Sequence, residues 1–184
     1  MEDSLTSRVT ELLKFGFIEI EADWVNHVDR LAYLIKYFAR KLPIHIVLHA
    51  SRKYIDMYSF FIDLELKIGD YENISFFWEN DIEAIAYHVL MMSRFGKGVM
   101  FLIIPYNRKL CSQIENIRLV SCSKILWRAV ENGWRIILIN PILTTSSPYE
   151  TIVTPYTYRL ILGSNGELEM KKIEKNYMYI SIKS

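Results

Sequence analysis

Cysteine, glycine and proline are scarce in this chain of 184 residues, which contains two cysteines, seven glycines and five prolines. Cys111 and Cys122 form no Cys-x-x-Cys pair, so we expect free thiols in a reducing compartment rather than a disulfide scaffold or a zinc site. The glycines and prolines are scattered, which argues against a linker or a low-complexity segment. Hydrophobic residues make up 51% of the chain, which excludes a disordered tail and predicts one domain with its own core.

Long apolar runs are also missing. The uncharged apolar run 99–106 has only eight residues and is too short to cross a bilayer. The first residues, Met-Glu-Asp-Ser, do not resemble a secretory signal. We therefore expect a cytoplasmic protein without a membrane anchor. Twenty-five isoleucines and a single glutamine, Gln113, indicate a heat-adapted source.

The net charge of +1 conceals a strong asymmetry between the two halves of the chain. Residues 1–91 carry 9 Lys/Arg and 15 Asp/Glu, a formal charge of −6. Residues 92–184 carry 13 Lys/Arg and 6 Asp/Glu, a formal charge of +7. A basic half suits an anionic partner such as nucleic acid, and it suits the acidic half of a neighbouring subunit equally well.

Hydrophobic periodicity predicts alternating helices and strands. Helices are expected over 4–15, 23–40, 53–66, 81–94 and 112–131, and strands over 17–21, 44–50, 74–79, 98–105 and 134–141. The ranges 158–162 and 167–173 flank Gly-Ser-Asn-Gly and predict a hairpin, 177–182 predicts one more strand, and 142–156 a long loop. This pattern predicts an α/β domain with a mixed, mostly parallel sheet, helices on both faces and a C-terminal antiparallel hairpin. Residues 1–40 are expected to extend a core formed by residues 41–184.

Motifs for nucleotide binding and hydrolysis are absent from the sequence. The only Gly-Lys pair, Gly96-Lys97, lacks the earlier glycine and the following hydroxyl residue of a phosphate-binding loop. The turn after the strand 44–50 contains no glycine, and no Gly-x-Gly-x-x-Gly or Gly-x-Ser-x-Gly occurs. His45 and His49 share a face of one strand, but no nearby carboxylate or cysteine completes a metal site, so packed histidines are expected.

A nuclease-like pattern is the least favoured interpretation. Asp63 and the tripeptide Glu65-Leu66-Lys67, with Asp56 upstream, bring carboxylates close to a lysine, as Mg²⁺-dependent phosphodiester cleavage requires. Glu169-Met170-Lys171 repeats the tripeptide. About one such tripeptide is expected by chance at this composition, and the first copy lies on a predicted helix rather than a strand.

From residue 98 onward the order of elements resembles the RecA/RadA recombinase superfamily. The run 98–105 lies where that family has its Walker B strand, and 123–133 resembles the helix before the next core strand. The run 136–141 is similar to the strand that leads into a mobile DNA-binding loop, and 156–162 with 167–173 resembles the closing hairpin.

The departures from that family decide what the resemblance implies. The Walker A lysine and glycines are missing, and Pro105 or Tyr106 stands where a magnesium-binding aspartate ends the Walker B strand. The resemblance therefore implies a degenerate, non-enzymatic paralogue without a cofactor, acting in recombination or repair. Such a paralogue binds single-stranded DNA, a partner recombinase, or both, and associates with copies of itself.

Under that resemblance, two loops at the carboxyl ends of parallel strands carry the candidate nucleic-acid site. Basic and aromatic side chains suit phosphate contact and base stacking, and hydroxyl groups can donate to phosphate. The candidate residues are Tyr106, Arg108 and Lys109 in the first loop, and Thr144, Thr145, Ser146 and Tyr149 in the second. The alternative is that Arg108 and Lys109 are solvated loop charges. Lys171, Lys172 and Lys175 are expected on an exposed hairpin face.

A second class of function is a protein-interaction module without affinity for nucleic acid. In this hypothesis apolar residues on the N-terminal helix, such as Leu5 and Leu12, are exposed and contact a partner.

Overall fold

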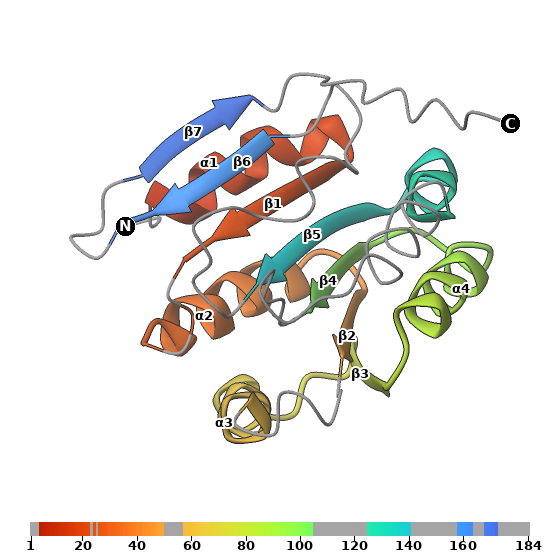
Figure 1. Cartoon of the computed structure of the whole chain (residues 1–184), viewed down its shortest axis with the longest axis horizontal. Coiled ribbons are helices and arrows are strands. Elements are labelled where there is room, and N and C mark those ends of the chain that lie inside the picture. Colours follow the sequence, from red (N-terminus) through yellow and green to blue (C-terminus); the bar gives the residue numbers. More distant parts are fainter. Residues whose placement is uncertain are drawn as a thin grey trace, which may run out of the picture.

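The computed structural model describes residues 4–22, 24, 26–49, 57–104, 125–140, 158–163 and 168–172. These residues form one seven-stranded sheet with helices on both faces (Figure 1). Within these ranges no helix is both long enough and apolar enough to span a bilayer.

The sheet has the strand order β3-β2-β4-β5-β1-β6-β7. All neighbouring strands pair in parallel except β6 and β7, which form an antiparallel pair. The strands are β1 (Phe17–Glu21), β2 (Ile44–His49), β3 (Ile74–Glu79), β4 (Val99–Ile103), β5 (Arg135–Asn140), β6 (Tyr158–Leu162) and β7 (Leu168–Lys172). The predicted fold class, a mixed and mostly parallel α/β sheet with a C-terminal antiparallel hairpin, is confirmed.

The helices divide between two hydrophobic clusters, one on each face of the sheet. α1 (Ser4–Leu12), α2 (Val28–Ala39) and α3 (Met57–Ile68) pack on one face, and the short 3-10 helix η1 (Leu13–Phe15) follows α1. α4 (Ile82–Met92) and the helical residues 125–131 pack on the other face. Because both faces are covered, the central strand β4 is buried along its whole length, as its continuous apolar sequence predicted.

Residues 1–40 were expected to form an extension, but β1 lies inside the sheet, between β5 and β6. Its residues are buried on both faces, including Glu19 at 1% exposure, so the strand is interior rather than half-exposed. The alternation of apolar and acidic residues suggested an exposed face because a sequence pattern cannot show that β5 and β6 flank this strand. α1 and α2 therefore belong to the layer that covers the main sheet.

Two predicted helices have different boundaries in the structure. The helix expected over 23–40 begins only at Val28, because Trp24 and residues 26–27 form turns. The helix expected over 53–66 extends to Ile68 and ends before Gly69, whose φ is 67°. The predicted strand 177–182, the loop 142–156 and most of the helix 112–131 lie outside the described residues.

Gly16 connects the N-terminal helices to the sheet. It follows η1 with a φ of 88°, and its amide donates to the Leu13 carbonyl. Its carbonyl accepts from the Ile136 amide, and a Cβ at this position would collide with the side chain of Val130. Only glycine satisfies both the left-handed backbone and the close approach.

Candidate functional site

The parallel strands bring their carboxyl ends to one edge of the sheet, which is where α/β proteins generally bind ligands. β1 ends at Glu21, β2 at His49, β3 at Glu79 and β5 at Asn140. Glu79 and Glu21 are only partly exposed. The described strand ends thus contribute carboxylates and an imidazole, and none of them is a lysine or arginine.

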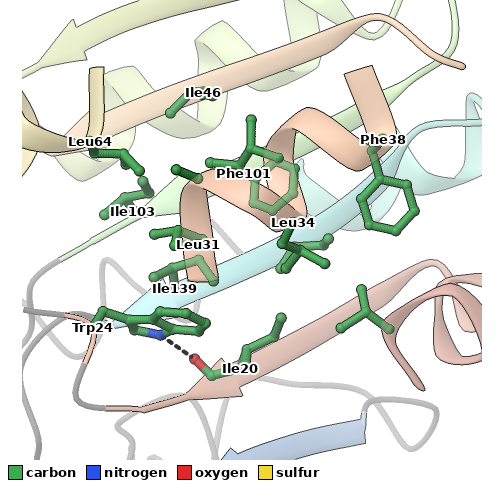
Figure 2. Packing of buried hydrophobic residues seen from close by; sticks show 14 of the residues in the cluster. Ile20, Trp24, Leu31, Leu34, Phe38, Ile46, Leu64, Phe101, Ile103 and Ile139 are labelled. Atoms are coloured by element: carbon green, nitrogen blue, oxygen red, sulfur yellow. Dashed lines mark hydrogen bonds between the residues drawn. The ribbon is translucent and has the colours of Figure 1, made fainter. Parts of the chain in front are cut away.

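The turn between β1 and α2 is closed by Trp24. Its side chain is completely buried, and the indole Nε1 donates to the Ile20 carbonyl at 3.2 Å. Figure 2 shows the indole beside β1, in the hydrophobic cluster that also contains Leu31 of α2 and Ile139 of β5. A large aromatic side chain therefore fills the space beneath this strand–turn–helix junction.

Two described amides of the same turn donate hydrogen bonds within the turn. The Trp24 amide donates to the Ala22 carbonyl at 2.9 Å, and the His27 amide donates to the Trp24 carbonyl at 3.2 Å. A phosphate-binding loop needs the opposite arrangement, in which glycines allow several N–H groups to point at the ligand. The sequence of this turn, residues 22–27, contains no glycine. The sequence of this turn therefore does not provide a glycine-rich phosphate cradle.

The predicted nucleic-acid residues Tyr106, Arg108, Lys109, Thr144, Thr145, Ser146 and Tyr149 all lie outside the described residues. The strands that lead into their two loops are described, and they are neighbours. Ile103 of β4 is in register with Ile139 of β5, and the Ile104 amide donates to the Ile139 carbonyl at 3.0 Å. Both loops therefore start from adjacent points on the carboxyl edge.

A cluster of histidines and aromatic rings lies beneath α4, on the face opposite α2. The ring of His45 lies 5.0 Å from that of Trp134 and 5.6 Å from that of Phe77, and Phe77 lies 4.2 Å from His88. Burial lowers the pKa of His45, and the nearby His88 lowers it further. His45 is therefore neutral at physiological pH and packs as an aromatic ring, as the sequence predicted.

His88 and His49 lie near groups at the carboxyl end of β3. The His88 Nδ1 lies 3.6 Å from the Glu79 carboxylate, which is longer than a hydrogen bond. The ring of His49 faces the Asn80 carbonyl, with Nε2 at 3.2 Å. The contact between His88 and Glu79 is not visible in the sequence, because the two residues come from different elements.

The nuclease-like pattern does not assemble a metal site in the described part of the chain. Glu65 and Lys67 lie on α3, and the Lys67 ammonium donates to Asp29 of α2 at 2.7 Å. That hydrogen bond raises the pKa of Lys67 and directs the lysine toward α2. No group of three potential ligands for a metal ion occurs among the residues whose positions are described.

A groove opens at the edge of β3 that no other described strand pairs, and sequence reasoning did not identify it. It has a volume of about 820 Å³ and is lined by residues of α3, of β3 and of the turn between them. Figure 1 shows α3 and β3 at the lower end of the sheet. Apolar side chains line it together with three carboxylates, and none of its lining residues is a cation. The lining includes Ile62, Leu66, Ile74, Phe76, Glu65, Asp70 and Glu72.

The expected docking residues of the N-terminal helix are not exposed. Leu5 is 1% and Leu12 is 3% exposed, and both belong to the core cluster beneath α1. The prediction of a partner surface at these leucines is therefore wrong. The reason is that the apolar face of α1 covers the same sheet that β1 enters, so that the helix has an intramolecular partner.

Comparison with known proteins shows a structural similarity but no family. No protein-family model matches this chain, and no curated protein matches it. Among solved structures, it is similar to a prototypical ATPase from the type III secretion system of pathogenic bacteria, with a TM-score of 0.43 and 10% identity. The alignment covers 82% of this chain and 52% of that one, so this chain spans about half the length of that ATPase. A similarity at this level carries no argument about activity, and the recombinase resemblance remains a prediction.

Proposed function

We propose that this chain is a non-catalytic, RecA-like accessory protein of DNA recombination or repair, which binds single-stranded DNA or a partner recombinase without ATP. The observation that carries the ATP-independent part is the closed turn between β1 and α2. There the Trp24 indole is buried, the Trp24 and His27 amides donate within the turn, and the sequence 22–27 contains no glycine for a phosphate-binding loop.

The DNA-binding part of the proposal rests on the two loops that follow β4 and β5. These strands are adjacent, so their loops start close together at the carboxyl edge. One loop carries Arg108 and Lys109 beside Tyr106, and the other carries hydroxyl residues and Tyr149. Cations that contact phosphates, with aromatic rings on which bases stack, form the usual platform for single strands.

Fluorescence anisotropy with labelled single-stranded DNA, over a series of salt concentrations and without nucleotide, tests this proposal. The wild-type protein is expected to bind with a steep salt dependence, and ATP should leave the affinity unchanged. The double variant Arg108→Ala/Lys109→Ala should bind more weakly. Its salt slope should fall by about 1.4, which is about 0.7 for each lost phosphate contact on a single strand.

The chain offers a matched control in Arg40 and Lys41, which are exposed at the end of α2. Since β2 begins three residues later, at Ile44, this pair lies at the amino edge of the sheet, away from the two loops. The variant Arg40→Ala/Lys41→Ala removes the same charge and should retain the wild-type slope. Equal losses in both double variants would refute the loop assignment, because binding would then follow total charge alone.

A protein-interaction module without affinity for nucleic acid is the second candidate. The groove between α3 and β3 favours it, because apolar side chains line an open sheet edge there. Absence of DNA binding at the lowest salt concentration would select this candidate over the first.

A further inference from the structure

β3 is an outer strand of the sheet, and among the described strands only β2 pairs with it. Every residue of β3 is at least partly exposed, in contrast to the fully buried β4. Unpaired strand edges readily accept another strand, and native proteins usually protect them. Among the described residues, no strand pairs with the outer edge of β3, so an added strand can pair there.

The groove beside this edge, bounded by α3 and β3, has both apolar and acidic character. Ile62 and Leu66 project from α3 and are 53% and 75% exposed, which is unusual for aliphatic side chains on one helix face. Glu65, Asp70 and Glu72 also line the groove, with no lysine or arginine among the lining residues. A complementary ligand would be an extended segment that is aliphatic on one face and basic at its ends.

We propose that the groove between α3 and β3 binds residues 177–182 of a second copy of this chain as an added β-strand. Residues 177–182 read Tyr-Met-Tyr-Ile-Ser-Ile, and Lys175 and Lys183 flank them. In an extended strand Met178, Ile180 and Ile182 share one face, which matches the aliphatic lining of the groove. Both this segment and β3 have six residues.

The charge of the segment and the length of chain that joins it to β7 indicate that a second copy, and not the same molecule, supplies the strand. Residues 171–184 carry four lysines and one glutamate, a side-chain charge of +3, against three carboxylates in the groove. β7 and β3 are the two outer strands of the sheet, six strand spacings apart, or roughly 29 Å at 4.7–4.9 Å per spacing. The five residue steps from Lys172 to Tyr177 span at most about 18 Å. The segment therefore cannot reach the β3 edge of its own molecule.

This inference deepens the protein-interaction function by naming the partner, and it is independent of DNA binding. The first test measures the molar mass of the full chain by light scattering after size exclusion. The wild type should exceed its monomer mass of 21.8 kDa. Deletion of 177–184 and the substitution Leu66→Glu should each give a monomer, the latter because a carboxylate would be buried against an apolar strand without a partner.

Phe95→Glu is the matched control. Phe95 is 78% exposed, close to the value for Leu66, but it does not line the groove. This variant should therefore retain the wild-type mass. Circular dichroism of each variant verifies that the fold is intact.

A second measurement tests the contact directly. A labelled peptide with the sequence of 175–183 is titrated into the protein that lacks 177–184, with a scrambled peptide for comparison. The native peptide should bind, Leu66→Glu should weaken binding by roughly tenfold or more, and added salt should weaken it further. A monomeric wild type that binds neither peptide would overturn the proposal, and so would equal binding of the scrambled peptide. An oligomer that survives the deletion would also overturn it. The anisotropy assay with DNA stays informative in each case, because Leu66 lines the groove on α3 and belongs to neither of the loops after β4 and β5.

Discussion

The closed turn at Trp24 leads to a quantitative prediction about stability. The indole is completely buried and donates one hydrogen bond, to the Ile20 carbonyl. Trp24→Ala removes the largest type of side chain from the core and leaves this carbonyl without its donor. Such substitutions lower the free energy of unfolding by about 3–5 kcal/mol. Since domains are stable by only about 5–15 kcal/mol, this loss should be large but compatible with folding.

The chain provides an internal comparison for the same substitution. Trp78 on β3 is 39% exposed, so Trp78→Ala should lower the free energy of unfolding by only about 1 kcal/mol, through its lost ring contacts with Tyr58 and Phe61. Trp24→Phe, which keeps an apolar ring but loses the hydrogen bond, should fall between the two alanine variants. Urea denaturation followed by far-ultraviolet circular dichroism measures all three without depending on tryptophan fluorescence.

The outcome also bears on the proposed function. If Trp24→Ala were no more destabilising than Trp78→Ala, the indole would not be a core residue and the turn would be open. The structural support for ATP-independent binding would then be lost. Nucleotide binding by wild type and by Trp24→Ala, measured by calorimetry, should be absent in both, because the turn also lacks glycines.

Three further predictions concern the backbone, a histidine and a helix end. Gly16→Ala should lower the free energy of unfolding by about 2–4 kcal/mol, because the alanine would have to adopt a positive φ and its Cβ would collide with Val130. Urea denaturation measures this loss, and a loss below about 1 kcal/mol would contradict the prediction. Because the pKa of His45 is lowered in the folded state, the unfolded chain binds the proton more tightly, and stability should fall as pH drops below about 6.5. The stability of His45→Phe should depend less on pH. Identical plots of thermal midpoint against pH for the two proteins would argue against this prediction. The Asp81 carboxylate caps α4 by accepting from the Glu83 amide at 2.7 Å. Asp81→Ala should therefore lower the free energy of unfolding by about 1 kcal/mol, and Asp81→Asn by less. Equal losses in the two variants would exclude capping.

Local sequence patterns predicted most of the described elements. Periodicity of 3.6 located α1, α3 and α4, and continuous apolar runs located β4 and β5, because those patterns reflect which faces are buried. The start of α2 was missed, since a side chain that turns into the core at Trp24 has the same apolar signature as a helix face. The only signal for the turn was a tryptophan soon after a strand, which is too weak to interpret alone.

The candidate sites divide in the same way. The sequence predicted the candidate loops after β4 and β5, because ligands generally bind at the carboxyl ends of parallel strands. The pairing of β4 with β5 in the structure adds that the two loops start side by side. Leu5 and Leu12 were expected on the surface but are buried, whereas Ile62 and Leu66 of α3 are exposed, and the sequence does not distinguish these aliphatic residues. Which helix face stays uncovered depends on what packs against it, and only the assembled sheet shows that.

The sequence by itself determined the α/β class, the absence of a glycine-rich phosphate loop and the opposite charges of the two halves, because these depend on composition and short-range spacing. The tertiary structure decided that β1 is an interior strand, that Trp24 closes the turn after it, and that the acidic, apolar groove lies at the free edge of β3. Strand order joins residues more than a hundred positions apart, as in the pairing of Phe17 with Ile136. That pairing results from the burial of whole faces rather than from any local pattern.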